Sequence, residues 1–131
     1  RRRLNSVVDR FVDELSIKCA GTAQPISSLS GGNQQKALLA RLLAVEPTVM
    51  LLDEPTRGID IGAKAEVQRL VQELADDGHG IVLVSSELED VVEGANRVVV
   101  LKNGRVVREV SDAEITEQNL IRLMAGAETV A

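Results

Sequence analysis

The sequence predicts an α/β domain with a largely parallel sheet flanked by helices. Helical and extended segments alternate along the 131 residues. Hydrophobic residues make up 44% of the chain and aromatic residues only 1%, so Val, Leu, Ile and Ala must build the core. That composition is typical of parallel strands covered on both faces. The length is enough for one domain with a modest core.

The first half of the chain predicts a helix, a loop, a second helix and a strand. Residues 6–15 form an amphipathic helix, with an apolar face made of Val7, Val8, Phe11, Val12 and Leu15. Residues 16–29 are irregular. A second helix covers 32–44, and Glu46-Pro47 ends it. The strand over 48–52 is apolar without alternation, which predicts that both of its faces are buried.

The next segments predict a helix, a strand and a short helix. The pattern of Val67, Leu70, Val71 and Leu74 gives a helix over 62–76 that stops at Asp77-Gly78. Residues 81–84 read as a second buried strand, and 87–93 as a short helix ended by Gly94.

The last segments predict a β-hairpin and a helix. Asn103-Gly104 is a strong hairpin signal, because both residues tolerate a positive φ angle. We expect it to pair a strand over 98–101 with one over 105–110. The final helix covers 116–125 and is expected to bury Leu120, Ile121, Leu123 and Met124.

Charge and composition exclude several classes of protein. The net charge of −5 argues against a dedicated nucleic-acid binder, which usually shows a basic stripe with stacking aromatics. The basic run Arg1–Arg3 is expected to be a solvated chain end. Cys19 stands alone, which excludes an internal disulfide and a multi-cysteine metal site. No apolar run approaches the roughly 20 residues of a membrane span, and no signal peptide is visible. Because the first residue is Arg, we expect a piece of a longer protein.

Ser30-Gly31-Gly32 is the first segment with a chemical signal. Glycines let the backbone approach an anion closely, and the helix that follows directs its free N–H groups and positive dipole end at that anion. Ser30 adds a hydroxyl donor. For these three residues alone, an ordinary loop with a serine cap is the simpler interpretation.

Asp53 and Glu54 form the second segment with a chemical signal. They come directly after an apolar strand, at the edge where ligands of open α/β sheets collect. Asp53 is suited to hold a hydrated Mg²⁺, and Glu54 to orient and polarise a water that attacks a terminal phosphate. Carboxylates at strand ends are common, so the pair alone is a weak signal.

Order and spacing make these two signals specific. Residues 28–36 read Ser-Leu-Ser-Gly-Gly-Asn-Gln-Gln-Lys, and residues 49–60 read Val-Met-Leu-Leu-Asp-Glu-Pro-Thr-Arg-Gly-Ile-Asp. Together they resemble the signature motif and Walker B segment of ATP-binding cassette (ABC) ATPases, which implies a partial P-loop NTPase fold. The chain has no Gly-x-x-x-x-Gly-Lys-Ser/Thr loop, so the Walker A strand is absent from it.

Two further strings narrow the resemblance. Residues 33–36, and residues 56–60 followed by Gly62-Ala63-Lys64, are similar to bacterial monosaccharide importers of the ribose, galactose, xylose and arabinose type. Their ATPase subunit carries two cassettes, and this sequence is most similar to the C-terminal part of the second. The resemblance implies that residues 1–46 end a helical signature subdomain and that 47–131 belong to the ATPase core.

The resemblance also implies a role for each matching residue. Signature residues would contact ATP held by the opposite cassette, and a D-loop over 57–60 would link the two composite sites. In the cassette's own site, Asp53 would bind Mg²⁺ and Glu54 would be the general base. The matching signature and D-loop positions are Ser30, Gly31, Gly32, Gln34, Gln35, Gly58 and Asp60.

Ser86 departs from the family pattern. ABC ATPases usually place a switch histidine there, whereas residues 84–88 read Val-Ser-Ser-Glu-Leu. A serine donates a hydrogen bond but does not exchange a proton near neutral pH. We therefore expect the site around Glu54 to hydrolyse poorly and the site completed by the signature turn to be the competent one.

Cofactors, partners and location follow from the same resemblance. It implies ATP and Mg²⁺, a second cassette, membrane permease subunits, an indirect link to a periplasmic sugar-binding protein, no nucleic acid, and a place at the cytoplasmic face of the bacterial inner membrane. The isolated chain is expected to be inactive, with weak ATP affinity. It is also expected to dimerise or swap elements, because an apolar sheet edge invites pairing.

Two other functions stay open at this point. The same motifs occur in the ATPase heads of chromosome-maintenance and DNA-repair proteins, which are flanked by long coiled coils. A catalytically silent ATP-binding module is the other possibility. His79, in Asp-Gly-His-Gly, is expected to be a solvated turn residue.

Overall fold

The computed structural model describes residues 2–126, with side chains from residue 5 onward. The described part falls into two compact units, which divide between Val82 and Leu83. Arg1 and the side chains of Arg2 and Arg3, which form the predicted basic chain end, lie outside the described residues.

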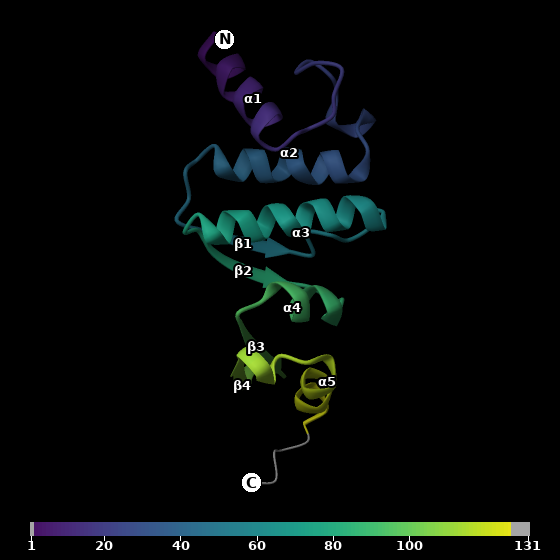
Figure 1. Ribbon diagram of the computed structural model, residues 1–131, viewed down its shortest axis with the longest axis vertical. Coiled ribbons are helices and arrows are strands. Elements are labelled where there is room, and N and C mark those ends of the chain that lie inside the picture. The colour runs from purple at the N-terminus through teal and green to yellow at the C-terminus, as the bar shows by residue number, and fades with distance from the viewer. Residues whose placement is uncertain (1, 127–131) are drawn as a thin grey trace. The chain divides into compact units, whose positions relative to one another are not determined.

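The first unit carries three helices and a pair of strands (Figure 1). Its elements are α1 (Arg2–Glu14), a 3-10 turn (Ile26–Ser28), α2 (Gly31–Leu43), β1 (Val49–Asp53), α3 (Ile61–Asp76) and the first part of β2 (Gly80–Val84), which crosses the boundary after Val82. Strands β1 and β2 pair and run in the same direction. The predicted helices and strands of this half are all present, and α1 begins four residues earlier than expected.

Burial alternates along β1, so the expectation that both faces are covered is wrong for this chain. Met50 is 3% exposed, whereas the neighbouring Leu51 is 74% exposed. Strand β2 is likewise exposed at Val82 and Val84. Helix α3 lies along β1 in this unit (Figure 1), and the described elements leave the Leu51 side chain largely uncovered.

The turn between α3 and β2 holds His79 more firmly than the sequence predicts. This residue is half-buried, and its Nδ1 lies 2.8 Å from the carbonyl oxygen of Pro47. Next to it, the N–H of Gly80 donates to the carbonyl of Thr48 over 2.8 Å. His79 therefore fixes this turn to the segment that leads into β1 instead of being solvated.

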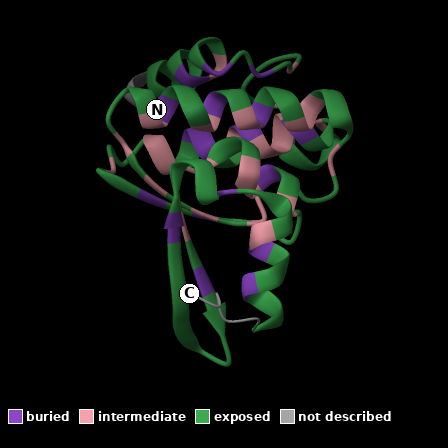
Figure 2. Ribbon diagram, turned by 60° about the horizontal axis from the view of Figure 1, so that its bottom comes forward, coloured by how far each residue is buried: buried purple, intermediate pink, exposed green. Residues whose placement is uncertain are grey.

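The second unit is a hairpin with helices packed against it. Its elements are α4 (Leu88–Gly94), β3 (Arg97–Lys102), β4 (Arg105–Ser111), a 3-10 turn (Asp112–Glu114) and α5 (Glu117–Ala125). The predicted turn is confirmed: Asn103 and Gly104 have φ angles of 51° and 73°, and β3 pairs antiparallel with β4. A register shift between Val100 and Leu101 marks a bulge, and the hairpin is exposed along most of its length (Figure 2).

Helix α5 buries only part of its predicted apolar face. The core of this unit consists of Val100, Val110, Ile115, Leu120 and Leu123. Ile121 and Met124 are about half exposed, which corrects the prediction for them. Because α5 contacts β3 and α4 along one side, a second apolar stripe on the helix finds no cover among the described elements.

Among the described residues, no helix has the length and apolar character needed to cross a membrane.

Candidate functional site

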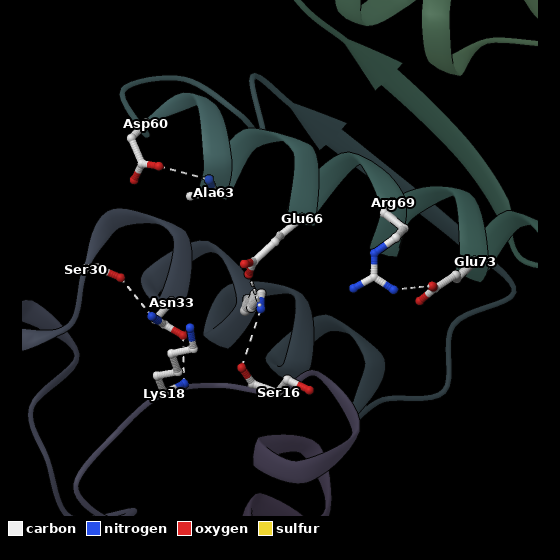
Figure 3. Close-up of polar contacts among 10 residues, drawn as sticks. Ser16, Lys18, Ser30, Asn33, Asp60, Ala63, Glu66, Arg69 and Glu73 are labelled. Carbon is white, nitrogen blue, oxygen red and sulfur yellow. Dashed lines mark hydrogen bonds and ion pairs between the residues drawn. The ribbon is translucent and has the colours of Figure 1, made fainter.

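Ser30 occupies the N-cap position of α2, but its side chain makes no cap hydrogen bond. Instead, Asn33 Nδ2 donates to Ser30 Oγ over 2.8 Å, and the Lys18 N–H donates to Asn33 Oδ1 over 2.7 Å (Figure 3). Because the Ser30 oxygen accepts from Asn33, its own O–H is turned to donate elsewhere. The first amides of a helix have no partner within that helix, so this turn suits an anion.

The two glutamines predicted for this surface have different places. Gln34 folds back onto the turn, where its Nε2 donates to the carbonyl of Leu29 over 2.8 Å. Gln35 faces a hollow of about 110 Å³ that Asp53 and Pro55 also line. The structure thus brings Gln35, predicted for the signature surface, and Asp53, predicted for Mg²⁺, to the same small cavity.

The segment after β1 makes a tight turn. Asp53 is exposed at the end of the strand, and Glu54 follows with a φ angle of 49°, in the left-handed region that non-glycine residues rarely adopt. The Arg57 N–H donates to the Glu54 carbonyl over 3.2 Å, and Gly58 has a φ angle of 75°. This strained turn redirects the chain from the strand into the loop that leads to α3.

Asp60 ends this loop as the N-cap of α3. Its Oδ1 accepts from the Ala63 N–H over 3.0 Å, and its carbonyl accepts from the Lys64 N–H over 2.8 Å (Figure 3). An aspartate at this position also places its negative charge at the positive end of the helix dipole. The 57–60 loop is therefore fixed at its end by α3.

The two glycines of the signature turn lie against this loop and the start of α3. A Cβ atom on Gly31 would come within 3.0 Å of the Ile59 side chain. A Cβ atom on Gly32 would come within 2.5 Å of the Ala63 Cβ. The signature turn and the predicted D-loop thus pack directly on each other.

An ion pair between a buried lysine and a half-exposed glutamate lies one helical turn further along the same two helices. Lys36 Nζ is 2.7 Å from Glu66 Oε2 and 3.4 Å from the Ser16 carbonyl oxygen. The Lys36 side chain is 8% exposed, and Glu66 is 49% exposed. The hydrogen bond from Lys36, followed by its positive charge, lowers the pKa of Glu66 below its ordinary value.

No individual role was predicted from the sequence for Asn33, Lys36, Ala63 or Glu66, and Ile59 was predicted only as part of the 57–60 loop. For Lys36 a usable signal existed. It shares the helical face of Gly32, Leu39 and Ala40, which are buried, and a lysine on a buried face needs an acidic partner. Nothing in the sequence alone indicates that this partner is Glu66, 30 positions away.

Ser86 belongs to the second unit, where it follows β2 and is exposed. Its neighbour Ser85 donates from Oγ to Asp90 Oδ2 over 3.3 Å and accepts from the Glu87 N–H over 3.1 Å. Asp90 is 3% exposed, so these contacts fix the start of α4.

Three sugar-import proteins resemble this chain over most of its length. The ribose import ATP-binding protein RbsA of Ruegeria sp. (strain TM1040) is 48% identical over 92% of this chain and 24% of its own. The L-arabinose transport ATP-binding protein AraG of Geobacillus stearothermophilus is 47% identical over 88% and 23%. The fructose import ATP-binding protein FruK of Bifidobacterium longum (strain NCC 2705) is 45% identical over 92% and 24%. The chain therefore spans about a quarter of the length of these relatives.

Solved structures give the same fold. The cbiO1 protein from Clostridium perfringens, part of the ABC transporter complex cbiONQ, matches with a TM-score of 0.74 and 28% identity over 93% of this chain and 49% of its own. A dimeric ATP-binding cassette, MJ0796, in a post-hydrolysis state with ADP and Pi matches with a TM-score of 0.69 and 28% identity over 81% and 46%.

The profile of the ABC transporter family matches residues 3–57, which include the signature turn and the carboxylates after β1. The chain is therefore similar in sequence to ATP-binding proteins of ABC transporters, and it has the fold of part of an ATP-binding cassette.

Proposed function

We propose that the protein containing this chain hydrolyses ATP to drive uptake of a monosaccharide across a bacterial inner membrane. The observation that carries the proposal is the hydrogen-bond chain from Lys18 through Asn33 to Ser30, which leaves the serine hydroxyl free to donate at a helix N-terminus. The ribose, arabinose and fructose import activities in the names of the relatives support the sugar class. They favour transport over a chromosome-maintenance ATPase head or a catalytically silent module.

In this proposal the signature turn acts on a nucleotide that the opposite cassette holds. Ser30 Oγ donates to an oxygen of the terminal phosphate, while Gly31 and Gly32 allow the helix backbone to approach it. Gln34 holds the turn through Leu29. A dimeric cassette with ADP and Pi is among the similar structures, which supports a site shared between two cassettes.

The carboxylates after β1 serve the cassette's own nucleotide. Within the described part of the chain no three His, Cys, Asp or Glu residues form a metal cluster. Asp53, exposed at the end of β1, would hold Mg²⁺, an ion that takes one or two protein carboxylates and otherwise binds phosphates and water. When bound, Mg²⁺ neutralises charge that develops on the phosphates. Glu54 accepts a proton from the water whose oxygen attacks the terminal phosphorus, as the bond to the bridging oxygen breaks to give ADP and phosphate.

Within the whole protein, residues 1–46 would end the helical subdomain and 47–131 would belong to the ATPase core. Gly58 and Asp60 would lie in the D-loop between the two composite sites. The partners would be the other cassette and the membrane permease subunits, with a periplasmic sugar-binding protein acting through the permease. The cassettes would lie at the cytoplasmic face of the membrane, and the isolated chain would be inactive.

The test compares Ser30→Ala with Glu54→Gln in the full-length protein assembled with its permease. Ser86 stands where the family has its switch histidine, so the Glu54 site should contribute little to turnover. We expect Ser30→Ala to lower kcat on the order of 10- to 100-fold and Glu54→Gln to lower it less than about threefold. Equal losses from the two variants would refute the asymmetry. A full-length protein without any ATPase activity or sugar uptake would refute the function itself.

A further inference from the structure

Helices α2 and α3 approach each other closely at Gly32 and Ala63. Gly32 is buried and has the ordinary backbone of a helix, so its conformation does not require glycine. The space does require it, because a Cβ atom there would lie 2.5 Å from the Ala63 Cβ. Ordinary contacts of a Cβ atom begin near 3.4 Å, so any larger residue must move one helix by about 0.9 Å.

We propose that Gly32 and Ala63 are positioning residues that set the distance between the signature turn and the 57–60 loop. This inference rests on the proposed function, because it assigns their effect to ATP hydrolysis. In the proposed mechanism the signature turn contacts the nucleotide of the opposite cassette. The 57–60 loop lies between that site and the site of the cassette's own nucleotide. The Gly32–Ala63 contact fixes these two segments to each other within one chain.

Three neighbouring contacts hold Gly32 and Ala63 in place. The Ala63 N–H donates to Asp60 Oδ1 over 3.0 Å, which ties this residue to the end of the loop (Figure 3). The Ile59 side chain fills the space beside Gly31. One turn further along both helices, the Lys36–Glu66 ion pair closes the interface at 2.7 Å. A displacement of α2 near Gly32 therefore moves Ser30 relative to the whole loop.

The experiment is a compensation test in the full-length protein with its permease. Gly32→Ala should lower kcat on the order of 10- to 100-fold, because a shift near 1 Å misplaces Ser30. Ala63→Gly should stay within about threefold of wild type, since it removes only a methyl group. The double variant Gly32→Ala/Ala63→Gly should return to within about threefold of Ala63→Gly, because one methyl group again fills the space.

Two further variants guard the interpretation. Gly94→Ala is the control, since Gly94 is also a helical glycine, at the end of α4, but a Cβ there meets nothing within 4 Å, and it should leave kcat unchanged. Ala63→Val creates the overlap from the other side with Gly32 intact and should also lower kcat. If Gly32→Ala does not fold, Ala63→Val carries the test alone, and a wild-type kcat for it would overturn the proposal.

The outcomes separate this inference from the proposed function. If the double variant folds with the melting temperature of Ala63→Gly but stays as slow as Gly32→Ala, then the nucleotide, not Ala63, requires the glycine, and the inference is wrong. If Ser30→Ala also leaves hydrolysis unchanged, the proposed role of the signature turn fails as well. Recovery of kcat in the double variant supports the positioning role.

Discussion

Lys36 Nζ and Glu66 Oε2, 2.7 Å apart, join the signature helix α2 to the helix α3 that follows the predicted D-loop. The lysine is almost completely buried and the glutamate is half exposed, so the two partners are not equivalent. Removing a partner from a buried charge costs more than replacing that charge with an apolar group of similar shape.

This asymmetry predicts that Glu66→Ala loosens the helix pair more than Lys36→Met does. Glu66→Ala leaves a buried ammonium group with only the Ser16 carbonyl, whereas Lys36→Met leaves a carboxylate that water reaches. Hydrogen exchange of α2 and α3 peptides in the full-length protein measures the effect. Glu73→Ala is the control, since Glu73 pairs with Arg69 at the surface of α3 and should change nothing. Faster exchange in Lys36→Met than in Glu66→Ala would contradict the prediction.

The same pair predicts a pH dependence. Its hydrogen bond lowers the pKa of Glu66 in the folded state. The stabilisation is therefore complete above the ordinary glutamate pKa, about 4.3, and is lost as the pH falls through the lower folded value. The wild-type protein should have a higher melting temperature than Glu66→Gln near pH 7. The difference between the two melting temperatures should shrink as the pH falls below about 4. Thermal shift assays of the full-length proteins measure it, and a gap that widens in acid would contradict the assignment.

Asn33→Ala should lower ATPase activity without unfolding α2. The substitution removes the donor that occupies Ser30 Oγ, so the hydroxyl is free to turn toward its own helix. We expect kcat of the full-length protein to fall about threefold to tenfold. Asn119→Ala is a matched control, because Asn119 holds the same third position in α5, with its side chain also hydrogen-bonded. Equal activity of the two variants would argue against the orienting role.

Asp60→Ala should expose the start of α3. Loss of an N-cap costs about 1 kcal/mol, which corresponds to roughly fivefold faster opening. Amides in the first turn of α3 should therefore exchange faster in the full-length protein, and Asp60→Asn should restore most of the protection. Thr116→Ala, which removes the cap of α5, should leave α3 unchanged. Unaltered exchange in Asp60→Ala would show that the loop is fixed by other contacts.

The isolated 131-residue chain should self-associate through the open face of β1. Val49 and Leu51 of β1 are exposed, as is Val82 of the neighbouring strand β2, and exposed apolar strands invite pairing with a second copy. Sedimentation velocity at increasing concentration should show a growing dimer fraction, and Val49→Thr/Leu51→Thr should suppress it. A monomer at all concentrations would contradict this prediction.

The sequence predicts local features, such as turns, better than it predicts which side chains are buried by packing. The turn at Asn103-Gly104 follows from the φ angles of two adjacent residues, and the structure confirms it. The burial of Leu51 and Ile121 depends on what packs against them, which periodicity does not reveal, and both predictions were wrong. Motif order indicated the signature turn and the carboxylates, whereas the Lys36–Glu66 pair joins positions that only the crossing of two helices brings together.

Helices α2 and α5 both begin with a hydroxyl residue at the N-cap and an asparagine at the third helical position, but the two hydroxyl groups have different hydrogen-bond partners. In α5 the Thr116 hydroxyl accepts from the backbone N–H of Asn119 over 3.2 Å, so the helix closes its own end. In α2 the corresponding asparagine presents its side chain to the Ser30 hydroxyl instead. The N-terminus of α5 is thus capped by a side chain, whereas the N-terminus of α2 has no side-chain cap. In the proposed function, this difference between the two asparagines leaves the N-terminus of α2 open to a phosphate, whereas the N-terminus of α5 is capped by its own threonine.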